Sequence, residues 1–311
     1  MKKILTIVVS ILIILFSFSC KKENTKISIA CPQGAPSLAL FDIASDIKNN
    51  TSDYSLTTLS SQTDVKAAFL SIDYDIIVSP INIGIQIYNQ NQNYNLLCGL
   101  TFGNLYFCSK EKIEKLSDLN NKSLVLFGKG TINDTITKYI LDSNSIHCNI
   151  EYVDSASTTK SLFVADTTNK VYMLAEPTKS ASFSALKEKG IDSFSISVEE
   201  EFEKLTNTKG FAQAGVFVKN NLDNKKLNQF MSKLDDSVRI LKDQTKIESN
   251  NKIIKELGYF NLSDIVMFDA IIGSNIDIVK GASMKEIVEK TYSINLNLVG
   301  ELPDEAFYKD I

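Results

Sequence analysis

Short β-rich runs alternate with helical runs from Ile27 onward, and this order leaves few folds open to the chain. Strands are predicted at 27–31, 54–59, 75–78, 123–127, 149–153, 171–174 and 194–197. Helices are predicted at 36–48, 64–70 and 81–88, with further helices beginning near 131, 156, 177 and 199. Alternating strands and helices are typical of open, mostly parallel sheets flanked by helices, so the predicted fold class is α/β.

The strand and helix runs fall into two series, which predicts two lobes. Two long strand-like runs, 95–109 and 212–218, lie between the series and after the second, and the remaining chain is mostly helical. We expect lobe 1 to comprise 27–103 and 212–311, and lobe 2 to comprise 104–211. A ligand would lie between the lobes, because open parallel sheets bind ligands outside the carboxyl ends of their strands.

The amino-terminal residues predict export. A basic head precedes the apolar run from Ile4 to Phe18, which is shorter than the roughly 20 residues that span a bilayer. Residues 1–19 are therefore expected to be a signal peptide. The predicted location is extracytoplasmic.

Cys20 follows this run, and a cysteine in that place is typical of a bacterial lipoprotein signal, in which its sulfur takes a diacylglycerol. We expect a lipid anchor to a bacterial membrane at Cys20, with 20–26 as a tether. Ser17 stands where such signals usually carry leucine, so an uncleaved helical anchor or an ordinary signal peptide stays open.

Composition limits the classes of partner. Hydrophobic residues make up 44% of the chain and charged residues 23%, which is enough apolar material for a real core. The net charge of −4 and the lack of a long basic block argue against nucleic acid. Arg239 is the only arginine and lies in a helical run, which argues against ligand capture by an arginine clamp.

Cysteine and histidine give little support to metal binding or catalysis. Cys31, Cys98, Cys108 and Cys148 show no C-x-x-C spacing and are expected to be free buried thiols, with a Cys98–Cys108 disulfide left open. The only histidine, His147, lies in a predicted loop. No metal, no cofactor and no catalytic residue is expected.

Polar turns follow several predicted strands and are the candidate binding positions of lobe 1. Glycine permits close backbone approach in the turn after the first strand, and free amide groups at a helix start can receive a ligand oxygen. The candidates are Gln33, Gly34, Ala35, Ser61, Ser79 and Asn82.

The corresponding turns of lobe 2 offer a second set. Thr131 and Asp134 resemble a capping box, which predicts a helix start with exposed amide groups beside two glycines. At the beginning of the crossover, an aromatic ring and an amide are expected near the hinge. The candidates are Phe102, Asn104, Gly128, Lys129, Gly130, Thr131 and Glu176.

These turns resemble those of a known family. The segments 32–36, 75–82, 116–122 and 175–177 are similar to the solute-binding lipoproteins of ABC importers, in particular to the type II group for nitrate, sulfonate, taurine and thiamine precursors. The resemblance covers 27–218. Asn121 replaces a glycine usual in the family, and asparagine also tolerates a left-handed turn.

The resemblance implies a two-lobed type II periplasmic-binding-protein fold joined by two hinge strands. It also implies a monomer that captures a small solute and delivers it to the permease and ATPase subunits of an ABC importer. A neutral or heteroaromatic solute suits the candidate residues best, with Phe102 as a stacking face. Two alternatives stay open: an enzyme on the same fold, using Cys31 or Glu176, or a surface lipoprotein that binds a partner protein.

Overall fold

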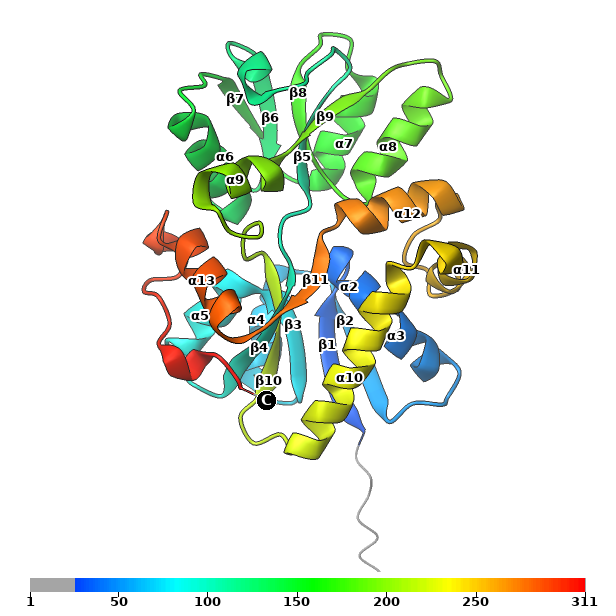
Figure 1. Cartoon of the computed structure of the whole chain (residues 1–311), viewed down its shortest axis with the longest axis vertical. Helices are drawn as coiled ribbons and strands as arrows, with labels where there is room; N and C mark the ends of the chain where they lie inside the picture. Colours follow the sequence, from blue (N-terminus) through cyan, green and yellow to red (C-terminus); the bar gives the residue numbers. More distant parts are fainter. Residues whose placement is uncertain (1–25, 311) are drawn as a thin grey trace, which may run out of the picture.

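The computed structural model describes residues 26–310, and within them the chain forms two sheets, one above the other in Figure 1. The predicted signal peptide, Cys20 and nearly all of the predicted tether lie outside the described residues. In the part of the chain that is described, no helix is both long and apolar enough to cross a bilayer.

The lobe 1 sheet has six strands in the order β11-β4-β10-β3-β1-β2. The strands are β1 (Ile27–Pro32), β2 (Tyr54–Leu59), β3 (Ile76–Pro80), β4 (Tyr94–Thr101), β10 (Ala214–Lys219) and β11 (Ile276–Val279). β1 pairs in parallel with β2 and β3. β10 runs antiparallel to β3 and β4, and β11 runs antiparallel to β4.

The lobe 2 sheet has five strands in the order β7-β6-β8-β5-β9. The strands are β5 (Leu105–Ser109), β6 (Ser123–Phe127), β7 (Asn149–Val153), β8 (Val171–Ala175) and β9 (Phe194–Ser197). β6 pairs in parallel with β7 and β8, whereas β5 runs antiparallel to β8 and β9.

The two-lobed α/β architecture is confirmed, but both sheets are mixed where mostly parallel sheets were expected. The antiparallel strands result from the way the chain passes between the lobes. β5 and β10 enter their lobes from the connecting segments, so each runs away from the partner lobe, against strands whose carboxyl ends point toward it. β11 is a four-residue strand that the sequence pattern did not reveal.

Helices cover both faces of each sheet (Figure 1). Those of lobe 1 are α2 (Ala35–Ala39), α3 (Phe41–Lys48), α4 (Gln62–Ser71), α5 (Ile81–Tyr88), α10 (Asn224–Leu241), α11 (Ile247–Glu256) and α13 (Gly281–Tyr292). Those of lobe 2 are α6 (Ile132–Ser143), α7 (Ala156–Ala165), α8 (Thr178–Lys187) and α9 (Val198–Thr206). Short 3₁₀ turns are η1 (Leu116–Leu119), η2 (Gln244–Lys246), η3 (Leu296–Leu298) and η4 (Glu305–Phe307).

The core follows from the alternation of side chains along buried strands. In β3, Ile76 and Val78 join the cluster under α3 and α10, whereas Ile77 joins the cluster on the opposite face with residues of α4 and α5. Successive side chains of a strand point to opposite faces, so a continuous apolar run serves a sheet that is covered on both sides. The helix predicted at 36–48 is instead divided at Leu40 into α2 and α3.

Two extended segments connect the lobes side by side. The Phe211 amide donates to the Phe102 carbonyl at 3.1 Å, and the Gln213 amide donates to the Thr101 carbonyl at 3.2 Å. Gly210 makes this approach possible, because a Cβ there would lie 2.0 Å from the Phe102 carbonyl oxygen. We call Phe102–Asn104 and 210–213 the hinge segments.

A third contact between the lobes was not predicted. α12 (Asp264–Gly273) lies between the lobes beside α8 (Figure 1), although the sequence placed it in lobe 1. The Tyr106 hydroxyl donates to the Gly273 carbonyl at 2.9 Å, and a Cβ on Gly273 would lie 2.8 Å from that hydroxyl oxygen. α12 therefore contacts lobe 2, while its residues Met267 and Ile271 lie in the lobe 1 core.

All four described cysteines are free, and the disulfide alternative for Cys98 and Cys108 is wrong because β4 and β5 belong to different sheets. Burial raises the pKa of Cys98 to about 12 and raises the pKa values of Cys31 and Cys108 as well.

This burial predicts a labelling pattern. In a Cys20→Ser variant, a thiol reagent should modify at most the half-buried Cys148 in the native protein and four thiols after unfolding. The count is read by intact-protein mass spectrometry. Rapid native labelling of a second thiol, or fewer than four modifications after denaturation, would contradict the described packing.

Candidate functional site

A cavity of about 630 Å³ lies between the two lobes and contains the turns that the sequence singled out. Lobe 1 contributes the carboxyl ends of β1 and β3 with the following turns, and lobe 2 contributes the end of β8 and the start of α6. Asn104 and Gln213 of the hinge segments also line the cavity. Strand-end turns from both sheets thus converge on one site, as the topology rule expects.

Eight of the thirteen predicted binding residues line this cavity. They are Gln33, Gly34, Ala35, Asn82, Asn104, Gly130, Thr131 and Glu176. Their contact with a ligand stays a prediction.

Ser61 and Ser79 do not line the cavity. The Ser61 hydroxyl accepts the Asp64 amide at 3.1 Å and caps α4. Ser79 is fully buried, and its hydroxyl donates to the Pro80 carbonyl at 2.9 Å. Both hydroxyls are committed to local structure, and Gln62, the next residue after Ser61, lines the cavity instead.

Phe102 does not offer the predicted stacking face. Its side chain is fully buried, and its ring lies where a Cβ on Gly99 would approach within 2.6 Å. The ring therefore fills the core beneath the hinge. The aromatic rings that line the cavity are those of Phe127 and Phe260.

Lys129 and Gly128, which belong to the same turn as Gly130 and Thr131, do not line the cavity. The Lys129 ammonium lies 5.1 Å from the centre of the Tyr152 ring, and the Gly128 carbonyl accepts the Thr131 hydroxyl at 2.6 Å. The predicted capping box is therefore absent, because the Thr131 hydroxyl turns back to Gly128 and does not cap the helix. The first amide groups of α6 have no partner within the helix and border the cavity.

Asp134 supports this turn from behind. Its carboxylate accepts the Gly130 amide at 2.9 Å, the Tyr152 hydroxyl at 2.6 Å and the Lys138 ammonium at 3.0 Å. Burial alone would raise the pKa of Asp134, but these hydrogen bonds outweigh burial and lower it. The carboxylate thus stays charged and holds Gly130 at the cavity edge.

Asn104 joins the two hinge segments to β8. Its amide nitrogen donates to the Glu176 carbonyl at 3.0 Å, and its amide oxygen accepts from the Gln213 side chain at 3.0 Å. The Glu176 amide donates to the Asn104 carbonyl at 2.9 Å. Asn104 therefore has a positioning role at the floor of the cavity.

Cys31 and Glu176 are the two candidates for a catalytic role in the enzyme alternative, and both side chains have structural partners. The Glu176 carboxylate accepts the Ser180 hydroxyl at 2.7 Å and pairs with Lys179 at 3.1 Å, which neutralises its charge within lobe 2. Cys31 is buried in the lobe 1 core. His147 is exposed, as expected, and the described residues contain no group of three potential metal ligands.

Several lining residues were not among the predicted ones. Lys66 lies one helical turn after Gln62 and shares its face, a signal that spacing could have revealed. Phe260 and Asn297 come from the helical tail and are far in sequence from the predicted strand-end turns. Lys66 and Glu176 are the only charged side chains among the described residues that line the cavity.

Comparisons with known proteins agree with this architecture. No family model and no curated protein sequence matches the chain. An ABC transporter protein from Parabacteroides distasonis superposes with a TM-score of 0.76 at 21% identity, covering 92% of this chain and 99% of that one.

Two further solved structures are similar. The ligand-binding component of an ABC-type import system from Staphylococcus aureus, with zinc bound, has a TM-score of 0.65 at 14% identity, covering 92% of this chain and 96% of that one. The periplasmic aliphatic sulphonate-binding protein of Escherichia coli has a TM-score of 0.67 at 11% identity, covering 91% of each chain. The chain adopts the two-lobed fold of periplasmic ligand-binding proteins.

Proposed function

We propose that the chain is an extracytoplasmic solute-binding lipoprotein that captures a small molecule between its lobes and delivers it to an ABC permease. The observation that carries the proposal is the cavity of about 630 Å³, which is lined by strand-end turns from both sheets. A cavity of this size suits a small organic solute. Two of the proteins of similar fold described above, those from Parabacteroides distasonis and Staphylococcus aureus, are components of ABC transport systems.

The solute is captured when the two lobes close around it, and no covalent bond needs to form or break. A ligand favours the closed state only through contacts that it makes better in that state, and a solute held by both lobes at once meets this condition. Gln33 and Asn82 face it from lobe 1, and Asn133 with the first amides of α6 faces it from lobe 2. The closed form would then dock on the permease.

The cavity chemistry supports a neutral solute with several hydrogen-bonding groups. Side-chain amides supply both donors and acceptors. Of the two charged lining residues, Lys66 is exposed to solvent and Glu176 is already paired with Lys179. Phe127 and Phe260 would pack on an apolar or heteroaromatic part of the solute. The anchor at Cys20 belongs to the same proposal and rests on the sequence alone.

Mass spectrometry of small molecules released from the unfolded protein tests the proposal. We expect one compound in stoichiometric amount, chemically unchanged on rebinding. Gln33→Ala and Asn133→Ala, one on each lobe, should each weaken its binding about 5- to 10-fold, as expected for the loss of one hydrogen bond. Gln244→Ala, an exposed glutamine outside the cavity lining, should leave the affinity unchanged.

Two results would contradict the proposal. One is conversion of the compound by the protein, which would favour an enzyme. The other is binding that tolerates both cavity substitutions.

A further inference from the structure

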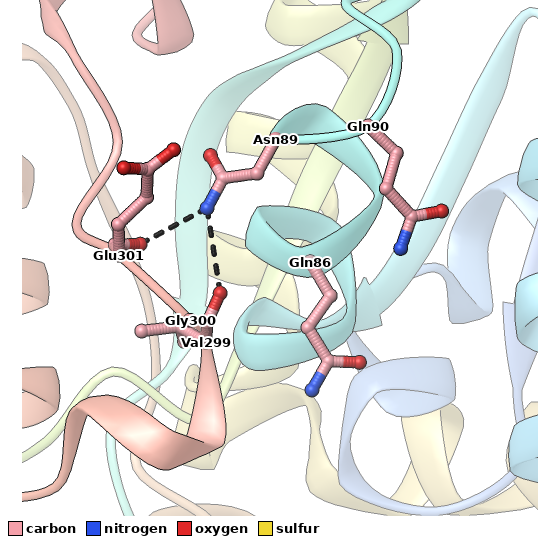
Figure 2. Close-up of a pocket in the computed structure, with 6 residues that line it drawn as sticks. All are labelled: Gln86, Asn89, Gln90, Val299, Gly300 and Glu301. Atoms are coloured by element: carbon pink, nitrogen blue, oxygen red, sulfur yellow. Dashed lines mark hydrogen bonds between the residues drawn. The ribbon is translucent and has the colours of Figure 1, made fainter.

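The loop after α13 forms a wall of the cavity that the sequence pattern did not suggest. This loop, 294–301, contains η3, and Asn297 and Leu298 line the space between the lobes. Val299, Gly300 and Glu301 of the same loop, together with Gln86, Asn89 and Gln90, line a separate surface groove of about 400 Å³ (Figure 2). The loop therefore borders both the solute cavity and this outer groove.

The base of the loop is fixed to α5 of lobe 1. The Asn89 side-chain amide donates to the carbonyls of Val299 at 3.3 Å and Glu301 at 3.0 Å, as Figure 2 shows. The Gln86 amide donates to the Leu298 carbonyl at 2.7 Å. Leu298 and Val299 are buried, and these hydrogen bonds tie this end of the loop to lobe 1.

The tip of the loop reaches lobe 2. The Asn295 side-chain amide donates to the Thr135 hydroxyl at 3.3 Å, and its oxygen accepts the Asn297 amide at 3.2 Å. Thr135 lies on α6 one helical turn after Thr131, which itself borders the cavity. One asparagine thus joins α6 of lobe 2 to the residue that faces the solute space.

We propose that the loop 294–301 is the third wall of the solute site, with Asn297 in contact with the solute and Asn295–Thr135 as a latch between the lobes. The inference rests on the proposed function. A neutral hydrogen bond at 3.3 Å is weak, so the latch biases closure without locking it. Its loss should speed solute release about 3- to 10-fold, because one of the contacts that favour the closed state is then missing.

The first experiment needs no solute. Hydrogen exchange of residues 295–300 is measured in ligand-free protein for Asn295→Ala, Thr135→Val and the double variant, with Ser293→Ala as the control. The Ser293 hydroxyl donates to the Glu289 carbonyl within lobe 1, so its loss spares the latch. Thr135→Val should raise exchange in the loop about threefold or more, although the substituted residue belongs to the other lobe.

The second experiment follows loss of the co-purified compound from the same variants by native mass spectrometry during dilution. Asn295→Ala and Thr135→Val should each shorten its retention about 3- to 10-fold, and the double variant should add little. Asn297→Ala should weaken retention without changing loop exchange.

The two readouts separate the inference from the function on which it rests. Unchanged loop exchange in Thr135→Val, or unchanged retention in both latch variants, would overturn the latch while leaving solute binding intact. Absence of any co-purified compound from the wild type would instead count against the proposed function, and the exchange data would then decide the latch alone.

Discussion

Replacing Gly210 with alanine should lower the free energy of unfolding by about 3 kcal/mol or more. Gly210 has a φ of 56°, a left-handed conformation that costs an alanine about 1 kcal/mol. The larger cost is steric, because the new Cβ would lie 2.0 Å from the Phe102 carbonyl oxygen. That oxygen accepts the Phe211 amide across the hinge, so it cannot move aside without breaking the contact between the hinge segments.

Gly190 provides the matched control for this prediction. It has a φ of 71°, and a Cβ there would meet nothing within 4 Å. Gly190→Ala should therefore show only the backbone cost, about 1 kcal/mol. Urea unfolding of both variants measures the difference, and equal destabilisation would show that the hinge segments are not packed as described.

Glu199 should make the stability of the protein depend on pH between about 4.5 and 7. It lies in the first turn of α9 of lobe 2 and accepts a hydrogen bond from Asn275, which also donates to the Gly103 carbonyl in the hinge. Burial, followed by repulsion from Glu203, raises the pKa of Glu199 to about 7, although the bond from Asn275 opposes the shift. Glu200 and Lys209 also act on this carboxyl, and Lys209 pairs with Asp277.

The raised pKa of Glu199 means that stability falls as pH rises. The folded protein favours the protonated carboxyl, so its stabilising effect is complete below pH 4.5 and is lost as pH rises through about 7. Because Glu199 is partly exposed, solvent screening reduces the effect to about 1–3 kcal/mol.

Substitution of Glu199 by glutamine should abolish this dependence. The variant keeps an oxygen that can accept from Asn275, and it should be about 1–3 kcal/mol more stable than the wild type at pH 8 and similar at pH 5. Glu248→Gln, at an exposed position in the first turn of α11, serves as the control. Chemical unfolding at the two pH values gives the comparison, and parallel pH profiles for the wild type and Glu199→Gln would refute the assignment.

The sequence predicted those parts of the fold that local pattern determines. β2 and α5 have the predicted bounds, because the partly buried β2 and the buried α5 both show their period over a few residues. Asn121 takes the left-handed conformation expected of it, with a φ of 62°. The strand-end turns at Gly34 and Thr131 meet in one cavity because the carboxyl ends of the parallel strands in each lobe face the partner lobe.

Features that depend on distant contacts were not predictable in the same way. Phe102 follows a strand like the other candidates, but Gly99 leaves space that the Phe102 ring fills together with the side chain of Met284. α12 contacts lobe 2 where Gly273 permits close approach to Tyr106, and a single glycine in a helical run does not reveal this. Asn297 reaches the cavity through a loop whose position is set by Asn89 of α5.

Calorimetric titration of emptied, refolded protein with the compound released from native material tests the central claim most directly. The account predicts one site per chain, affinity near micromolar, or about −8 kcal/mol, and recovery of the compound unchanged. Affinity should fall when either Gln33 of lobe 1 or Asn133 of lobe 2 is replaced by alanine. Binding that survives both substitutions, or a compound that emerges chemically altered, would contradict capture between the two lobes.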